Sequence, residues 1–283
     1  MDTFQDKVAV ITGAASGIGY ALAQRCAQER MKVVLADIEE AALAQAEQEL
    51  RAAGATVLSV CTNVAQAEEV EQLAQRTLTA FGAVHLLCNN AGVAVSGPLW
   101  TMTPQDWEWV LGVNLWGVIH GIRTFVPLML AQGTACHIVN TASIAGLVST
   151  PMLGVYNVTK HGVVTLSETL YQELQETGAQ IKVSVLCPGW VNTRIGKSAR
   201  NRPAALRNTP PRAANAAATD AVDDAMQEVI QAGLPPAAIA EQVFTAIREE
   251  RFYILTHPPF QKLIEKRVQG ILQGRNPVAA GFV

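Results

Sequence analysis

Short apolar segments alternate with longer amphipathic ones along most of the chain. The apolar segments are rich in Val, Ile and Leu, as buried strands are, and glycines close several of the amphipathic, helix-like segments. Strands and helices in alternation build βαβ units, and these form a parallel sheet covered by helices. We therefore expect one α/β domain over residues 1–283, with a doubly wound sheet of seven strands at residues 7–11, 32–36, 56–60, 84–88, 135–140, 181–187 and 251–256.

A glycine-rich turn follows the first expected strand and leads into a helical pattern that runs to about Arg30. Gly13 permits a tight turn, Gly17 leaves room for a pyrophosphate beside the backbone, and Gly19 lets the helix pack closely on the strand. The helix N-terminus offers N–H groups to phosphates. The spacing Gly-x-x-x-Gly-x-Gly is not the more familiar fingerprint, so a glycine turn without a ligand remains the alternative. We expect a Rossmann-like dinucleotide site with contacts from Gly13, Ser16, Gly17, Ile18 and Gly19.

The second expected strand ends at Asp37, at about the distance from the glycines that a ribose-binding carboxylate requires. A carboxylate accepts hydrogen bonds from ribose hydroxyls and repels a 2′-phosphate. The following residue, Ile38, brings no cation, so we expect NAD to be preferred over NADP. The alternative is that Asp37 only caps the helix that starts near Glu39.

Further polar and small residues follow the third and fourth expected strands. In a parallel sheet, ligands bind beyond the carboxyl ends of the strands. We therefore expect cofactor contacts from Asn63, Val64, Asn90, Ala91 and Gly92.

Tyr156 and Lys160 lie four residues apart on a helix expected to run to about Glu176, so they share one face. A free tyrosine has a pKa of about 10. A neighbouring lysine cation would lower this pKa, which makes Tyr156 a candidate proton-transfer residue. The alternative is an ordinary aromatic residue beside a solvated lysine.

An asparagine stands out in the apolar helix expected over residues 104–130. The neighbours of Asn114 include Trp109, Val110, Leu115 and Val118. Because a buried amide needs hydrogen-bond partners, its presence here requires an explanation.

Together these features resemble the short-chain dehydrogenase/reductase family over about residues 5–195. The resemblance is carried by Thr12-Gly13-x-x-x-Gly17-x-Gly19, Asn89-Asn90-Ala91-Gly92, Asn114, Ser143, Tyr156-x-x-x-Lys160, Pro188-Gly189 and Thr193. It implies reversible hydride transfer between a nicotinamide cofactor and a carbonyl or secondary alcohol. Asn63 departs from the more usual aspartate, but its amide can still contact adenine.

The resemblance also implies roles for individual residues. Tyr156 exchanges the proton, Lys160 lowers its pKa and holds the nicotinamide ribose, Ser143 hydrogen-bonds the substrate oxygen, and Asn114 holds a water that links Lys160 to solvent. Tyr156 and Lys160 are therefore expected both as catalytic residues and as cofactor contacts. The resemblance also implies cofactor contacts from Pro188, Gly189, Val191 and Thr193.

Mostly uncharged residues flank these motifs, as in many small-molecule pockets. We expect a hydrophobic ketone or alcohol to contact Val95, Ile144, Ala145, Leu153, Trp190 and Ile195, although half of these could belong to the core. An epimerase or dehydratase of the same fold, or a non-catalytic dinucleotide-binding regulator, are the alternative functions.

The C-terminal third is less informative. Residues 194–235 are expected to form a substrate lid, as in the family resembled, and residues 257–283 form a C-terminal extension. Residues 194–212 contain six cations and no acid. These cations could attract an anionic substrate, or they could pair with the acidic stretch from Asp220 to Glu228, which we favour because charge runs usually face water.

Composition excludes several other classes. The net charge is −3, and no basic motif suggests nucleic acid. The N-terminus does not look like a signal peptide, and no apolar run is expected to span a membrane. The five cysteines and five histidines show no metal-ligand spacing, so no metal is expected. We expect a reduced, cytoplasmic protein. The apolar residues around the 104–130 helix, together with the family resemblance, favour a homodimer or homotetramer.

Overall fold

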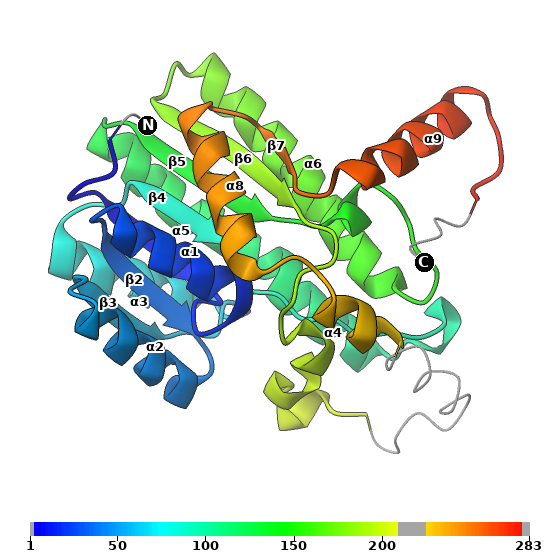
Figure 1. Ribbon diagram of the computed structural model, residues 1–283, viewed down its shortest axis with the longest axis horizontal. Coiled ribbons are helices and arrows are strands. Elements are labelled where there is room, and N and C mark those ends of the chain that lie inside the picture. Colours follow the sequence, from blue (N-terminus) through cyan, green and yellow to red (C-terminus); the bar gives the residue numbers. More distant parts are fainter. Residues whose placement is uncertain (1–2, 209–224, 279–283) are drawn as a thin grey trace.

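In the computed structural model, which describes residues 3–208 and 225–278, seven parallel strands form one sheet. Their order is β3-β2-β1-β4-β5-β6-β7, so the chain winds outward from β1 in both directions (Figure 1). The doubly wound, Rossmann-like α/β fold expected from the sequence is therefore confirmed. The strands are β1 (Val8–Thr12), β2 (Lys32–Asp37), β3 (Val57–Cys61), β4 (Leu86–Asn89), β5 (Cys136–Thr141), β6 (Ile181–Cys187) and β7 (Tyr253–Leu255).

The central strands are buried along their whole length, which explains why they do not alternate between apolar and polar residues as half-exposed strands do. Every residue of β1 and β5 is buried. The register aligns Ile11 of β1 with Leu35 of β2 on one side and with Cys88 of β4 on the other. The strand order reverses beside β1, so a crevice opens between the carboxyl ends of β1 and β4, where such sheets bind ligands.

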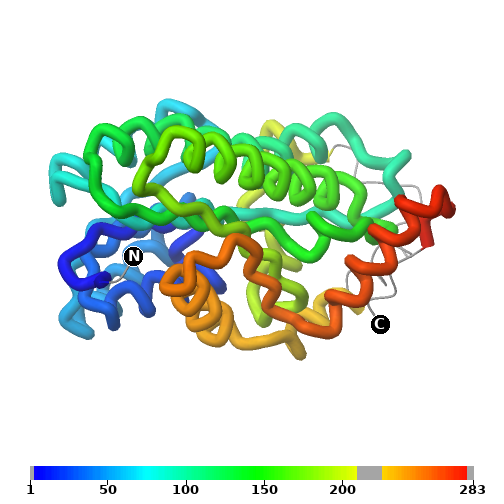
Figure 2. Tube along the Cα trace, turned by 90° about the horizontal axis from the view of Figure 1, so that it is seen from above, coloured from blue at the N-terminus to red at the C-terminus, as the bar shows by residue number. Residues whose placement is uncertain are grey.

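Helices cover both faces of the sheet in two layers (Figure 2). One face carries α1 (Gly17–Gln28), α2 (Glu40–Ala52) and α8 (Pro236–Arg248), whose apolar side chains share a core with Ile11 and Leu35. The other face carries α3 (Ala67–Phe81), α5 (Gly117–Gln132) and α6 (Gly154–Glu176), packed on Val10 and Ile138.

The helix expected over residues 104–130 is interrupted. It begins as α4 (Pro104–Leu111), passes through a π-helical segment at Gly112–Trp116, and continues as α5. Thr103 closes the N-terminus through a capping box with Asp106. The run Pro104–Gln132 is long and apolar enough to cross a membrane, contrary to the sequence expectation, but 44% of its most apolar stretch is buried inside the protein, as in a core helix.

The chain after β6 covers the carboxyl edge of the sheet and then leaves it. It forms two 3₁₀ segments at Ile195–Asn201 and Ala204–Leu206, and residues 225–231 are helical before α8. After β7, a 3₁₀ turn at Pro258–Phe260 leads into α9 (Gln261–Leu272), which projects away from the sheet (Figure 1). Within the described residues, α9 has no buried side chain.

Candidate active site

A cavity of about 660 Å³ runs along the carboxyl edge of the sheet, from the β1–α1 turn to the segments that follow β6. Most residues predicted for the site line this cavity: Gly13, Ser16, Gly17, Ile18, Asp37, Ile38, Asn63, Val64, Asn90, Ala91, Gly92, Ser143, Ile144, Ala145, Leu153, Tyr156, Lys160, Pro188, Gly189, Trp190, Val191, Thr193 and Ile195. The described lining omits Gly19, Val95 and Asn114. The fold thus brings residues from each of these motifs together in the lining of one cavity.

The glycine turn after β1 is shaped by close backbone approach. Gly13 has φ +66°, and a Cβ there would lie 2.8 Å from the Ala91 Cα. A Cβ on Gly17, with φ +57°, would lie 3.1 Å from the Thr193 Cγ2. Gly19 packs against the turn itself, because its Cβ would lie 2.1 Å from the Gly13 carbonyl oxygen. The N-terminus of α1 therefore opens into the cavity beside a turn without side-chain bulk, a fit for a pyrophosphate.

Asp37 is 9% exposed at the end of β2 and organises two turns at once. Its Oδ2 accepts the Ala15 N–H at 2.9 Å, and its Oδ1 accepts the Glu39 N–H at 3.0 Å. Burial raises the pKa of this carboxyl, while the backbone hydrogen bonds act in the opposite direction. Asp37 therefore supports the start of α2, as the alternative held, and also lines the cavity where a ribose would lie.

Two asparagines predicted as cofactor contacts also order the backbone. The Asn63 Oδ1 accepts the Ala65 N–H at 3.1 Å, and the Asn90 Nδ2 donates to the Thr12 carbonyl at 2.9 Å. The Thr12 hydroxyl, in turn, accepts the N–H groups of Asn90 and Ala91 at 2.9 and 3.1 Å. Thr12 thus ties the β1 and β4 turns together, a role that its place at the start of the glycine motif could have suggested.

Asn114 is fully buried and holds the segment after β4 to the helix layer. Its Oδ1 accepts the Val93 N–H at 2.8 Å, and its Nδ2 donates to the Val93 carbonyl at 2.9 Å and to the Thr159 hydroxyl at 3.2 Å. These bonds use both hydrogens of the amide. A water predicted at Asn114 would therefore have to bind another atom of the residue, and this water remains a prediction.

Ser143, Tyr156 and Lys160 lie on one wall of the cavity, at the end of β5 and on the first turns of α6. The Lys160 ammonium donates to the Thr141 carbonyl at 2.8 Å and lies 5.5 Å from the centre of the Tyr156 ring. The Ser143 hydroxyl donates to the Pro188 carbonyl at 3.3 Å and accepts the Ala145 N–H at 3.1 Å. The shared helix face predicted for Tyr156 and Lys160 is present.

The predicted lowering of the tyrosine pKa is not what the structure shows. Loss of solvation raises the pKa of Tyr156 to about 12, and a hydrogen bond with Ser143 offsets this only in part. Burial also lowers the pKa of Lys160 to about 8. The pKa differs from the prediction because the sequence shows a nearby cation but cannot show that the fold removes water from the hydroxyl. The phenol is therefore in its proton-donating form at neutral pH.

The far end of the cavity is mainly apolar. Of the six predicted pocket residues, Val95 instead packs with Trp107 and Met102 against the cluster around Trp109. The pattern of motifs did not point to several other apolar lining residues, among them Trp109, Leu206, Met226 and Ile230. Leu206, Met226 and Ile230 come after the last motif residue, Thr193, so motif spacing could not reveal them. In the sequence, Trp109 stands out only as an apolar neighbour of Asn114.

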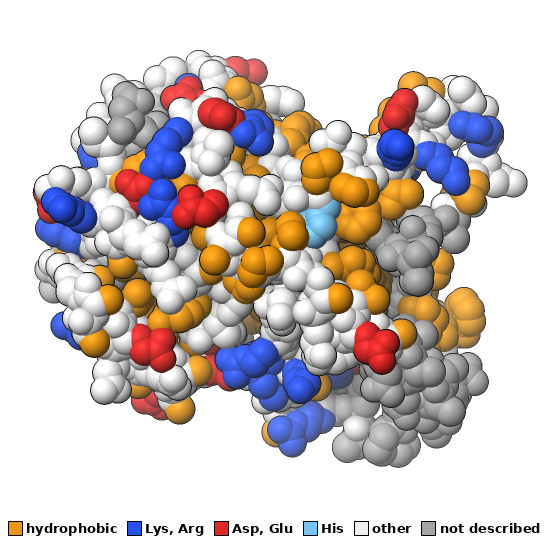
Figure 3. Space-filling view, viewed as in Figure 1, with side chains coloured by type: hydrophobic (Ala, Val, Ile, Leu, Met, Phe, Trp, Pro, Cys, Tyr) orange, Lys and Arg blue, Asp and Glu red, His pale blue; other side chains and the backbone are white. Residues whose placement is uncertain are grey.

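Side-chain ion pairs hold the described part of the expected lid. Glu39 accepts hydrogen bonds from Arg200 and Asn201 at 2.6 and 2.9 Å and lies 3.7 Å from Arg194. Arg202 pairs with buried Asp106 of α4 at 2.8 Å. Blue side chains gather at the lower edge of Figure 3, over this segment.

These partners differ from the predicted ones. The structure pairs three of the lid cations with Glu39 and Asp106, which lie far away in sequence, whereas residues 220–224 of the expected acidic partner lie outside the described residues. In the described chain, Lys197 and Arg207 have no ion pair, so attraction of an anionic substrate remains a prediction.

Comparison with known proteins agrees with this geometry. The short chain dehydrogenase family model matches residues 7–204. A CLA biosynthesis dehydrogenase/reductase of Lactiplantibacillus plantarum is 37% identical over 98% of this chain and 97% of its own length. A C alpha-dehydrogenase of a Sphingobium strain is 34% identical over 98% and 89%. The crystal structure of a short-chain dehydrogenase/reductase from Burkholderia phymatum in complex with NAD has a TM-score of 0.97 and 48% identity, with full coverage of both chains.

The chain belongs to the short-chain dehydrogenase/reductase family. It is an NAD(P)-dependent oxidoreductase that acts on CH–OH groups of a small-molecule substrate. The cavity fits this assignment, since its glycine turn leaves room for a pyrophosphate and the Asp37 carboxylate lines the cavity at the end of the neighbouring strand, β2. Among the described residues, no group of three or more His, Cys, Asp or Glu side chains could hold a metal ion.

Proposed function

We propose that the protein is an NAD-preferring dehydrogenase/reductase of hydrophobic secondary alcohols and ketones. The observation that carries this proposal is the wall formed by Ser143, Tyr156 and Lys160, which faces a cavity whose far side is apolar. The apolar side includes Leu153, Trp190 and Ile195. A substrate that places its carbonyl at the wall would bury its hydrocarbon part there.

The wall supplies both hydrogen bonds that a reacting oxygen requires. The protonated phenol of Tyr156 donates its proton to the carbonyl oxygen in reduction and takes it back in oxidation. When substrate binds, the Ser143 hydroxyl would turn from the Pro188 carbonyl, which it meets at a long 3.3 Å, and donate to the same oxygen, where negative charge develops. When bound, the nicotinamide supplies or accepts the hydride, and its oxidised ring adds a positive charge that favours the phenolate.

Lys160 supports the tyrosine from behind. A hydrogen bond to the Thr141 carbonyl holds its ammonium 5.5 Å from the centre of the tyrosine ring. A cation at this position lowers the cost of the phenolate during oxidation. We assign the contacts with the nicotinamide end to Pro188, Gly189, Val191 and Thr193, which line the cavity beside the wall.

The preference for NAD rests on the β2–α2 turn. Asp37 faces the cavity and Ile38 brings no positive charge, so a 2′-phosphate would meet a buried carboxylate. Glu39 adds a second carboxylate, which is engaged by Arg200. The relative from Burkholderia phymatum was crystallised with NAD, which supports the same choice.

The test is a panel of neutral aromatic, alicyclic and aliphatic alcohols and ketones with NAD and NADP, followed at the nicotinamide absorbance. We expect turnover of hydrophobic substrates, and Tyr156→Phe should reduce kcat by about a thousandfold while NADH still binds. Tyr171→Phe, on the same helix but in contact with Phe252, is the matched control and should retain activity. Unchanged turnover by Tyr156→Phe would refute the assignment.

The same panel separates the alternative functions. An epimerase or dehydratase would convert substrate without net change in NADH, and a regulator would bind the dinucleotide without turnover. Net NADH formation from simple alcohols contradicts both.

Assembly as a homodimer or homotetramer is part of the proposal. Trp116, Leu130 and Val158 are each 45–49% exposed along the π-helical segment, α5 and α6, the helices that the sequence favours as a subunit contact. A monomer by light scattering at micromolar concentration would refute this assembly. A cytoplasmic location is also proposed, in keeping with five free cysteines.

A further inference from the structure

The loop that follows β6 is fixed through its backbone on two sides. The Pro188 carbonyl accepts the Ile144 N–H at 2.9 Å as well as the hydroxyl of Ser143. The Trp190 carbonyl accepts the Leu234 N–H at 3.0 Å, and the Asn192 N–H donates to the Leu234 carbonyl at 2.9 Å. Residues just after β5 and just before α8 thus anchor both ends of the loop. These hydrogen bonds involve Pro188, Trp190 and Asn192 but not Gly189 between them.

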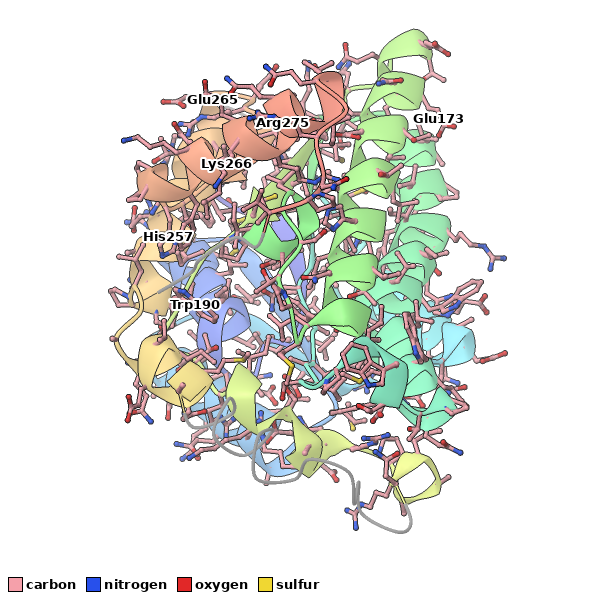
Figure 4. The ribbon with its side chains drawn as sticks, turned by 90° about the vertical axis from the view of Figure 1, so that its right-hand side faces the viewer. Glu173, Trp190, His257, Glu265, Lys266 and Arg275 are labelled. Carbon is pink, nitrogen blue, oxygen red and sulfur yellow. The ribbon has the colours of Figure 1, made fainter. Side chains whose placement is uncertain are left out.

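His257, the second residue after β7, provides a support at Gly189. Its Nδ1 accepts the Gly189 N–H at 3.1 Å, and its Nε2 lies 3.0 Å from the Trp190 carbonyl. Because Nδ1 is an acceptor, the ring proton must be on Nε2, which then donates to Trp190. Figure 4 shows His257 beside Trp190, at the base of the segment that leads to α9.

The surrounding packing keeps the imidazole in this orientation. Phe260 stacks on the ring at a centroid distance of 5.5 Å, and the Thr256 hydroxyl lies 2.7 Å from Nδ1. The loop approaches so closely that a Cβ on Gly189 would lie 2.2 Å from Phe260 and 2.9 Å from the His257 ring. Burial lowers the pKa of His257, which favours the neutral ring that this hydrogen-bond pattern requires.

We propose that His257 is a positioning residue for the nicotinamide end of the cofactor, because one neutral imidazole sets the spacing between the Gly189 N–H and the Trp190 carbonyl. The C-terminal segment thereby shapes the site from outside the cavity, since His257 itself does not line it. This inference rests on the proposed function, in which Pro188, Gly189 and Val191 contact the nicotinamide.

The test compares the binding of NADH with that of ADP-ribose, which is NADH without its nicotinamide ring. ADP-ribose contains the adenosine, the pyrophosphate and the second ribose but no nicotinamide, so it does not need the loop. In His257→Phe, which keeps a ring on Phe260 and removes both hydrogen bonds, the Kd of NADH should rise about tenfold by calorimetry. The Kd of ADP-ribose should stay within about twofold of wild type.

Two further variants make the result specific. His257→Asn places an amide oxygen near the position of Nδ1, so it should restore part of the NADH affinity by accepting the Gly189 N–H. Lys266→Ala, on exposed α9 of the same extension, should change neither ligand. Thermal unfolding of each variant reports any general loss of stability.

The outcomes separate the two proposals. If NADH and ADP-ribose lose affinity in parallel, or if neither changes, His257 does not position the nicotinamide end and the inference is wrong. If the wild-type protein binds neither ligand, the proposed cofactor function itself has failed.

Discussion

The two ends of the cavity are built in different ways. At the dinucleotide end, the walls are strand ends and turns held by hydrogen bonds between side chains and nearby backbone groups, as where the Thr12 hydroxyl joins the turns after β1 and β4. At the proposed substrate end, the described part of the expected lid is held mainly by side-chain ion pairs between segments far apart in sequence. The first end therefore depends on geometry, whereas the second depends on charge and can be loosened by a single substitution.

The two lid attachments also differ from each other. Arg202 and Asp106 form a pair that is 10% and 1% exposed, with the guanidinium 5.1 Å from the Trp109 ring centre. The pair between Arg200 and Glu39 is 31% and 21% exposed, so solvent weakens it. The lid should thus be fixed firmly at α4 and only loosely at the β2–α2 turn.

The largest expected effect in this comparison comes from reversing the charge beside Asp37, where we propose that the protein distinguishes NAD from NADP. Asp37→Ala combined with Ile38→Arg should lower the ratio of kcat/KM for NAD to that for NADP by about a hundredfold, since it removes repulsion and adds a cation beside the 2′-phosphate. Steady-state kinetics with both cofactors measures the ratio. Equal efficiency of the wild type with NAD and NADP would already count against the premise.

A smaller effect is expected from loosening the firm attachment of the lid. Arg202→Met leaves the Asp106 carboxylate buried without its cation, which is strongly unfavourable. The KM of a hydrophobic substrate should rise about tenfold, while the Kd of NADH changes less than about twofold. Arg207→Met, at an exposed position of the same segment, is the matched control. A parallel loss of NADH affinity would show that the two ends of the cavity are not separable.

The smallest effect is expected from the more exposed ion pair, between Arg200 and Glu39. In Glu39→Gln the KM of a neutral substrate should rise about threefold at 0.1 M salt, and in the wild type it should rise similarly between 0.1 and 1 M salt as the pair is screened. The hydrogen bond from Arg200 lowers the pKa of Glu39, so the carboxylate stays charged as the pH falls to its ordinary value of 4.5, and the attachment should be lost only in stronger acid. If Glu39→Gln keeps the salt dependence of the wild type, another contact holds the lid.

Most of the fold could be predicted because its signals are local. The β6 strand was predicted to the residue, since its β-branched and apolar residues form a short run that stops at Pro188-Gly189. The positions of the glycine turn, Asp37 and the Tyr156–Lys160 pair followed from strand–turn–helix order. These features depend on residues near each other in the sequence.

The parts that could not be predicted depend on distant contacts. Glu39 meets Arg200 across 161 residues and His257 meets Gly189 across 68, and no local pattern encodes either pair. The pKa of Tyr156 depends on how completely the fold removes water from its hydroxyl, which a neighbouring lysine does not reveal. Val95 looked like a pocket residue because of its place in the sequence, but it packs against the buried cluster around Trp109.

The π-helical segment at Gly112–Trp116 carries, in effect, one inserted residue. Each residue of an α-helix advances the chain by about 100°. Deleting one residue here would therefore rotate α4 against α5 by about that angle. Trp109 could then no longer face the cavity while Phe125 still faces the sheet, and Asn114 would turn away from Val93. The extra residue, rather than the type of any one residue, is thus what lets α4 face the cavity while α5 faces the core.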